Sequence, residues 1–110
     1  MKKYCTSRLL LPLLAATALS MATSVKASEA IVKQARCVAC HTVDAKRVGP
    51  AYKDVAAKYR GDPAAPANLF NKVRAGGSGN WGQVPMLPHP ADKISDEDLK
   101  AAIAWVLALE

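Results

Sequence analysis

Five consecutive residues, Cys37-Val38-Ala39-Cys40-His41, constrain this chain more than any other part of its sequence. The C-x-x-C-H pattern is the attachment signature of c-type haem. Two thiols separated by two residues can form thioethers with the two vinyl groups on one edge of the porphyrin, and the adjacent imidazole can bind the iron. The sequence therefore predicts one covalent haem c, attached through Cys37 and Cys40, with His41 as an axial ligand.

Other chemistries use two cysteines at this spacing. Disulfides, thioredoxin-like redox pairs and zinc sites are the alternatives. A redox pair gains nothing from the adjacent histidine, and a zinc site needs a further ligand from a chain whose other histidine is His89. The haem interpretation is the most specific of these, and the others remain open to a spectroscopic test.

The first 27 residues have the pattern of an export signal. A basic N-terminal region is followed by an apolar stretch over residues 9–22. The segment Val25-Lys26-Ala27 then has small residues at the two positions that a signal peptidase recognises. The stretch is shorter than the ~18–20 residues of a membrane-spanning helix, and Cys5 precedes it, so neither a membrane anchor nor a lipid anchor is expected. We predict cleavage after Ala27, export to the periplasm, no membrane insertion, and one domain over residues 28–110.

Removal of residues 1–27 would change the charge balance. The full chain has 15 lysines and arginines against nine aspartates and glutamates. Residues 28–110 keep 11 of the basic and all nine acidic residues, a net charge of +2, which two haem propionates would neutralise. This balance gives little support for nucleic-acid binding, and none is expected.

Beyond residue 27 the sequence predicts an all-α fold of about four short helices wrapped around the haem. Apolar spacing and helix-breaking residues place the helices at residues 29–36, 50–58, 65–75 and about 95–109. Ser28 is a candidate N-cap, and Ser95-Asp96-Glu97-Asp98 resembles a capping box. Residues 76–93 are rich in glycine and proline, so we expect a loop and no strand. So short a chain has little core of its own, and we expect the apoprotein to fold poorly.

The second axial ligand decides what a haem protein does. Met86 is the one methionine beyond the predicted signal, and flanking prolines in Val84-Pro85-Met86-Leu87-Pro88 would direct its thioether. A thioether opposite an imidazole raises the reduction potential. Met86 could instead be core filler, and His89 could supply a second imidazole. We predict Met86 as the ligand, with His89 as the competitor.

From residue 35 to residue 109 the chain resembles the short bacterial class I cytochromes c of the c-551/c-552 type. The resemblance is carried by Cys37-Val38-Ala39-Cys40-His41, Val48-Gly49-Pro50-Ala51-Tyr52-Lys53-Asp54-Val55-Ala56-Ala57-Lys58, Gly79, Trp81-Gly82, Pro85-Met86 and Trp105-Val106. It implies a small class I cytochrome c fold and a periplasmic electron carrier, not an enzyme, with a His/Met haem. Two departures, Gln83 in place of a usual proline and His89 in place of a frequent asparagine, affect the methionine loop.

The resemblance also implies roles for residues around the haem. The Pro50 carbonyl would accept a hydrogen bond from His41 Nδ1 and fix its tautomer. Trp81 would donate its indole N–H to a propionate, and Lys72 stands where the family usually has an arginine near the propionates. A further set is assigned to haem packing: Tyr52, Tyr59, Leu69, Val73 and Trp105.

The implied partners are redox proteins that a monomeric carrier would meet in turn. The donor would be of the quinol-cytochrome c reductase type, and the acceptor a terminal oxidase, nitrite reductase or peroxidase. We expect docking at the haem edge beside the thioethers, within a ring of Val38, Ala39, Val48, Val84 and Leu87, with Lys46 and Arg47 outside it. Two other function classes remain as alternatives: a haem enzyme or sensor with a bis-His or vacant sixth position, and a thiol oxidoreductase or metal carrier that uses Cys37 and Cys40 without haem.

Overall fold

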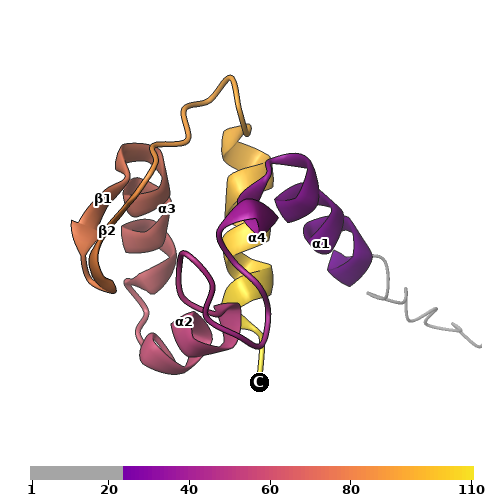
Figure 1. The fold of residues 1–110 in the computed structure, drawn as a ribbon. Coiled ribbons are helices and arrows are strands. Elements are labelled where there is room, and N and C mark those ends of the chain that lie inside the picture. The colour runs from indigo at the N-terminus through magenta and orange to yellow at the C-terminus, as the bar shows by residue number, and fades with distance from the viewer. Residues whose placement is uncertain (1–23) are drawn as a thin grey trace, which may run out of the picture.

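A computed structural model describes residues 24–110 of the chain, so residues 1–23 of the predicted export signal lie outside the described part. The elements in order are α1 (Ser24–Gln34), the 3-10 turn η2 (Cys37–Ala39), α2 (Tyr52–Lys58), α3 (Ala65–Ala75), β1 (Gly77–Gly79), β2 (Gly82–Met86) and α4 (Asp96–Leu107). Helices α1, α2 and α3 each pack against α4, which stands at the centre of the molecule (Figure 1). The predicted arrangement of four short helices is confirmed.

Helix α4 forms where its sequence pattern predicts. The Ser95 hydroxyl oxygen accepts a hydrogen bond from the backbone N–H of Asp98 at 3.1 Å, which caps the helix. Three acidic residues in the first turn lie near the positive end of the helix dipole. The buried stripe of Leu99, Ala102, Ile103 and Val106 faces the other helices.

The core is divided into two clusters on α4. One contains Tyr52, Val55 and Val106, and the other contains Ile94, Leu99 and Ile103. Among residues 28–110, no large side chain is less than 2% exposed. The apolar side chains therefore surround an open space instead of filling it, as expected if a cofactor completes the core.

The helix boundaries differ from the predictions at two places. Helix α2 begins at Tyr52, two residues later than predicted, because Ala51 is an extended N-cap residue and Pro50 precedes it. Helix α1 begins at Ser24, so Ser28 is a buried residue within the helix and not its cap. In the uncleaved chain the predicted cleavage point after Ala27 thus lies inside α1. Helix α3 has the predicted bounds.

Within the predicted loop of residues 76–93, the expectation of no strand is wrong. Strands β1 and β2 form an antiparallel hairpin in which Gly77 pairs with Met86 and Gly79 with Gly82. Residues 77–85 are all exposed. The pairing therefore depends on backbone hydrogen bonds. Strands are predicted from alternating apolar and polar residues, and a hairpin that buries neither face has no such alternation.

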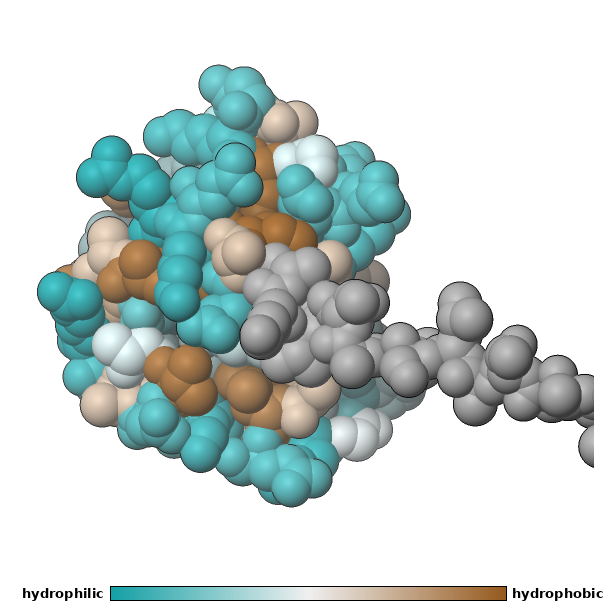
Figure 2. Space-filling view, turned by 90° about the vertical axis from the view of Figure 1, so that its right-hand side faces the viewer, coloured by the Kyte–Doolittle hydropathy of each residue, from teal (hydrophilic) through white to brown (hydrophobic). Residues whose placement is uncertain are grey.

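The surface seen from the α1 side is mostly hydrophilic, with separate apolar patches between the polar side chains (Figure 2). Within residues 24–110, no helix has the length and hydropathy of a membrane span.

Candidate functional site

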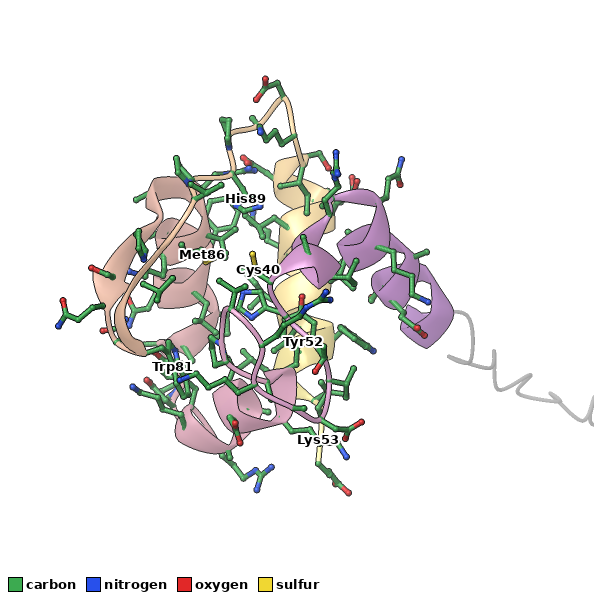
Figure 3. All side chains as sticks on the ribbon, in the orientation of Figure 1. Cys40, Tyr52, Lys53, Trp81, Met86 and His89 are labelled. Carbon is green, nitrogen blue, oxygen red and sulfur yellow. The ribbon has the colours of Figure 1, made fainter. Side chains whose placement is uncertain are left out.

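A cleft of about 650 Å³ opens between the helices and the hairpin. Its volume is typical of a site for a small molecule or cofactor. All the site residues predicted from the sequence line it: Cys37, Cys40, His41, Pro50, Lys72, Trp81 and Met86. In Figure 3, Met86 lies on the side of α3 and the hairpin, and Cys40 lies nearer α1 and α4. The fold therefore brings together residues that are up to 49 positions apart in the chain.

The His41 ring is held in one orientation by three neighbours. Its Nδ1 lies 2.8 Å from the Pro50 carbonyl oxygen. Because a carbonyl can only accept, Nδ1 carries the proton and Nε2 keeps its lone pair free for a metal. A Cβ on Gly49 would lie 2.5 Å from His41 Cε1, so only glycine allows this close approach. The Tyr52 ring stacks on the imidazole, with centroids 5.2 Å apart and planes inclined by 14°.

The two cysteines lie in and directly after the tight turn η2, which begins after Arg36 in the left-handed conformation. Both thiols are free, and Cys40 is the more exposed. Burial raises the pKa of the Cys37 thiol, although a hydrogen bond with Tyr52 acts in the opposite direction. A redox-active thiol pair requires a lowered thiol pKa, so this environment does not suit a thiol oxidoreductase.

Met86 is the last residue of β2, and its position depends on α3. Gly76 follows α3 directly, and its backbone lies against Met86 and Leu87 so closely that a Cβ would overlap the Met86 carbonyl oxygen. His89 also lines the cleft; its backbone N–H donates to the Val73 carbonyl at 3.0 Å and its Nδ1 to the Leu87 carbonyl at 2.8 Å. The methionine and its predicted competitor therefore both border the cleft.

Trp81 and Lys72 border the cleft at the hairpin end. Trp81 is 39% exposed, and the Lys58 ammonium lies 4.5 Å from the centroid of its ring. Of the residues assigned to haem packing, Tyr52, Tyr59, Leu69 and Val73 line the cleft, whereas Trp105 is not among the residues that line it. It packs edge-on against Tyr52, with ring centroids 5.7 Å apart, and so supports the ring that stacks on His41.

Two contributions were not predicted from the sequence. The first is the contact of Tyr52 with His41, since the sequence indicates Tyr52 only as a haem-packing residue. Arg74 at the end of α3 hydrogen-bonds to the segment that follows Met86. The partners of Arg74 are mainly backbone carbonyls, which every residue has, so no sequence motif indicates them.

These residues fit a covalently bound haem. The cleft has two thiols beside an imidazole with a free Nε2 lone pair, and a thioether also borders it. A bare metal ion has less support, because the described residues contain no group of three or more His, Cys, Asp or Glu side chains that could hold one.

Comparison with known proteins agrees with this geometry. The family model described as cytochrome c matches residues 25–110. Cytochrome c-551 of Allochromatium vinosum is 51% identical over 96 residues, covering 87% of this chain and 100% of the relative. Cytochrome c-551 of Pseudomonas aeruginosa is 42% identical and covers 98% of each chain.

A solved structure has the same fold. The crystal structure of Nitrosomonas europaea cytochrome c552 superposes with a TM-score of 0.67 at 45% identity, over 74% of this chain and 99% of that one. The chain therefore belongs to the cytochrome c family and is a small electron carrier of the c-551/c-552 type with one covalently attached haem c.

Proposed function

We propose that this protein is an exported, periplasmic electron carrier whose haem iron is bound by His41 and Met86. The observation that best supports the proposal is that one cleft is bordered by both thiols, by an imidazole with a free Nε2 and by the one methionine beyond residue 27. A bound haem supplies one-electron chemistry, with its iron alternating between the ferric and ferrous states. If His41 and Met86 both bind the iron, the protein would leave no open position for a substrate, which favours electron transfer over catalysis.

Each side chain around the cleft has a role in this proposal. His41 presents Nε2 because the Pro50 carbonyl holds the proton on Nδ1. The thioether of Met86 would bind the iron as a weak donor, which would raise the reduction potential. Trp81 and Lys72 supply an N–H donor and a positive charge for the haem propionates.

The ligand assignment can be tested with two variants. Met86→Ala should remove the weak long-wavelength band of the ferric iron–sulfur bond and lower the reduction potential. His89→Ala should keep the band. If Met86→Ala keeps the spectrum of the native protein and His89→Ala changes it, the haem is bis-histidine and the assignment is wrong. Retention of the colour on the polypeptide after acid acetone extraction checks the covalent attachment.

Export is tested separately, by mass spectrometry of the protein recovered from the periplasm. Cleavage after Ala27 leaves Ser28 as the first residue. Recovery of the uncleaved chain from the cytoplasm would contradict the proposal.

Exposed apolar side chains border the cleft where a partner would dock. Val48 is 51% exposed, Val84 64% and Leu87 73%, and all three line the cleft. Beside them, Arg47 donates a hydrogen bond to the Val38 carbonyl at 3.2 Å, so a positive charge adjoins the apolar ring. A small apolar centre with few charges suits the transient complexes of redox proteins, with a reductase as donor and an oxidase, nitrite reductase or peroxidase as acceptor.

The docking surface is tested by stopped-flow electron transfer with the cognate partner. Val84→Glu should slow the reaction at every salt concentration, because it places a charge in the apolar centre. Lys46→Glu with Arg47→Glu should slow it mainly at low salt, because rim charges act on the association rate. Unchanged rates in Val84→Glu would place docking elsewhere.

A further inference from the structure

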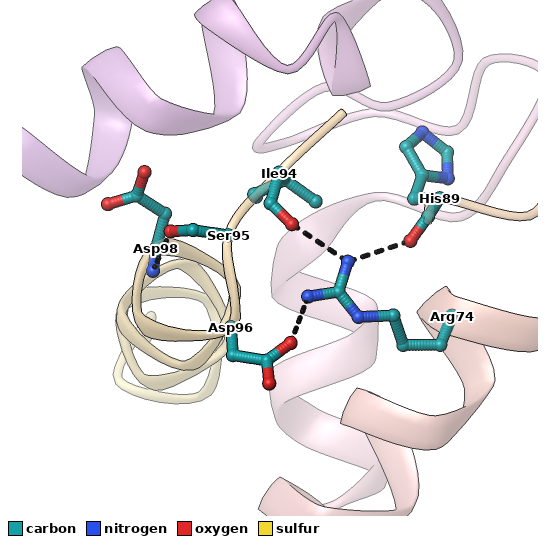
Figure 4. Close-up of polar contacts among 6 residues, drawn as sticks. All are labelled: Arg74, His89, Ile94, Ser95, Asp96 and Asp98. Carbon is teal, nitrogen blue, oxygen red and sulfur yellow. Dashed lines mark hydrogen bonds and ion pairs between the residues drawn. The ribbon is translucent and has the colours of Figure 1, made fainter. Parts of the chain in front are cut away.

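Arg74, in the last turn of α3, contacts three acceptors from a different part of the chain (Figure 4). Its Nη1 donates to the carbonyl oxygens of His89 and Ile94, both at 2.8 Å. Its Nη2 forms an ion pair with the Asp96 carboxylate at 2.5 Å. We call these four residues the Arg74 network. The side chain of Arg74 is only 18% exposed, so water screens its hydrogen bonds less than those of a surface arginine.

The Arg74 network joins α3 to three points further along the chain. His89 lies three residues after Met86, Ile94 is a buried core residue, and Asp96 is the first residue of α4. The neighbouring Val73 carbonyl accepts the backbone N–H of His89 at 3.0 Å. Two successive residues of α3 therefore hold the chain at one point, just beyond the methionine.

This attachment matters because the chain directly after Met86 is exposed. Leu87 is 73% exposed, and residues 87 and 88 lie outside any helix or strand. A planar guanidinium can reach three acceptors in different directions, whereas the single nitrogen of a lysine cannot do so with the same geometry. Charged hydrogen bonds in a partly buried site are also stronger than neutral ones.

We infer that Arg74 is a positioning residue for the axial methionine: it limits how often the segment that carries Met86 moves away from the haem iron. The inference rests on the proposed function, because it requires Met86 to be the ligand. Its consequence is that the Arg74 network sets how readily a foreign ligand displaces the methionine. The apparent affinity of such a ligand rises in proportion to the fraction of molecules in which Met86 is detached.

The experiment is a titration of the ferric holoprotein with imidazole, followed through the iron–sulfur band. Arg74→Gln should bind imidazole about tenfold more tightly or more, since it loses charged hydrogen bonds that hold the loop. Arg74→Lys should lie between this variant and the native protein. Arg60→Gln is the matched control, because Arg60 donates to the Leu109 carbonyl at the other end of the molecule, and it should change the affinity by less than about twofold.

Stability is measured on the same variants by denaturant unfolding, so that a purely structural role can be recognised. If Arg74→Gln lowers stability and leaves the imidazole affinity at the native value, the inference is overturned. If Arg74→Gln yields no folded holoprotein, Asp96→Asn, which keeps both carbonyl contacts, should still raise the affinity several-fold, and an unchanged value overturns the inference. A native protein without the iron–sulfur band would overturn the proposed function and this inference together.

Discussion

On one side of the cleft, the His41 ring contacts the Pro50 carbonyl, the Gly49 backbone and the face of Tyr52, which is itself buried and supported by Trp105. On the other side, Met86 ends an exposed two-stranded hairpin. Its segment is held by the close approach of Gly76 and, beyond the methionine, at His89, whose N–H donates to the Val73 carbonyl and whose carbonyl accepts from Arg74. The histidine thus packs against the core through Tyr52, whereas the methionine belongs to an exposed segment held at its ends.

This difference has a physical consequence for the haem site. A ligand packed into the core can leave only when the core opens, which costs much of the stability of the protein. A ligand on an exposed segment can leave by local opening, whose free energy is smaller. We therefore expect the methionine side to determine how often the iron is accessible, and the histidine side to determine whether the protein is folded.

The largest effect should come from removing the haem, because both sides of the cleft are built around it. Cys37→Ala with Cys40→Ala prevents haem attachment and leaves the apolar walls of the cleft in contact with water. Because the two core clusters surround this space, we expect low helicity and no cooperative thermal unfolding by circular dichroism. A cooperative melt that matches the holoprotein would contradict this account of the core.

On the methionine side, Gly76→Ala should have the next largest effect. Gly76 has φ 69° and ψ −152°, a conformation that only glycine adopts readily, and a Cβ would overlap the Met86 carbonyl. We expect a loss of about 2–3 kcal/mol from backbone strain, and an iron–sulfur band weakened out of proportion to the helical signal. Equal weakening of the band and of the helical signal would show that the two sides are not separable, and an intact band would show that Gly76 does not position Met86.

On the histidine side, Gly49→Ala should lower the free energy of unfolding without selective loss of the iron–sulfur band. The new methyl group would displace the His41 ring, at a cost of about 1–3 kcal/mol. Gly61→Ala is the control: Gly61 also has positive φ, 78°, but nothing lies within 4 Å of its Cβ position. Only the strain of about 1 kcal/mol applies there. Equal losses in both variants would show that contact with His41 is unimportant.

The smallest effect concerns Arg36, which precedes the haem-binding motif. Within the described chain it is the one non-glycine residue with positive φ, 62°. Asparagine tolerates this conformation better, so Arg36→Asn should stabilise the holoprotein by about 0.5–1 kcal/mol in denaturant unfolding. Arg36→Gln removes the charge without relieving the strain, and a similar gain in that variant would assign the effect to charge.

The histidine side could be predicted from the sequence more completely than the methionine side. The C-x-x-C-H motif identifies the attachment site, and the resemblance supplies the contact of Pro50 with His41 Nδ1, which has the expected geometry. Helices α3 and α4 follow from apolar spacing and from the cap at Ser95. These features depend on the type of side chain at each position, which the sequence gives directly.

The methionine side depends on backbone groups and could be predicted only in part. The prolines indicated a directed Met86, but the hairpin pairs through main-chain hydrogen bonds between exposed residues. Arg74 binds two main-chain carbonyls that no motif marks. The predicted start of helix α1 is wrong because Ser28, a residue type that favours the N-cap, lies within a longer helix of the uncleaved chain.

One measurement tests the comparison directly in the native ferric holoprotein. Guanidinium chloride is titrated while the iron–sulfur band and the far-ultraviolet circular dichroism are followed on the same samples. We expect the band to disappear at a lower denaturant concentration than the helical signal, because Met86 detaches before the core around His41 opens. Coincident transitions would contradict it, since they would show that both sides of the cleft open as one unit.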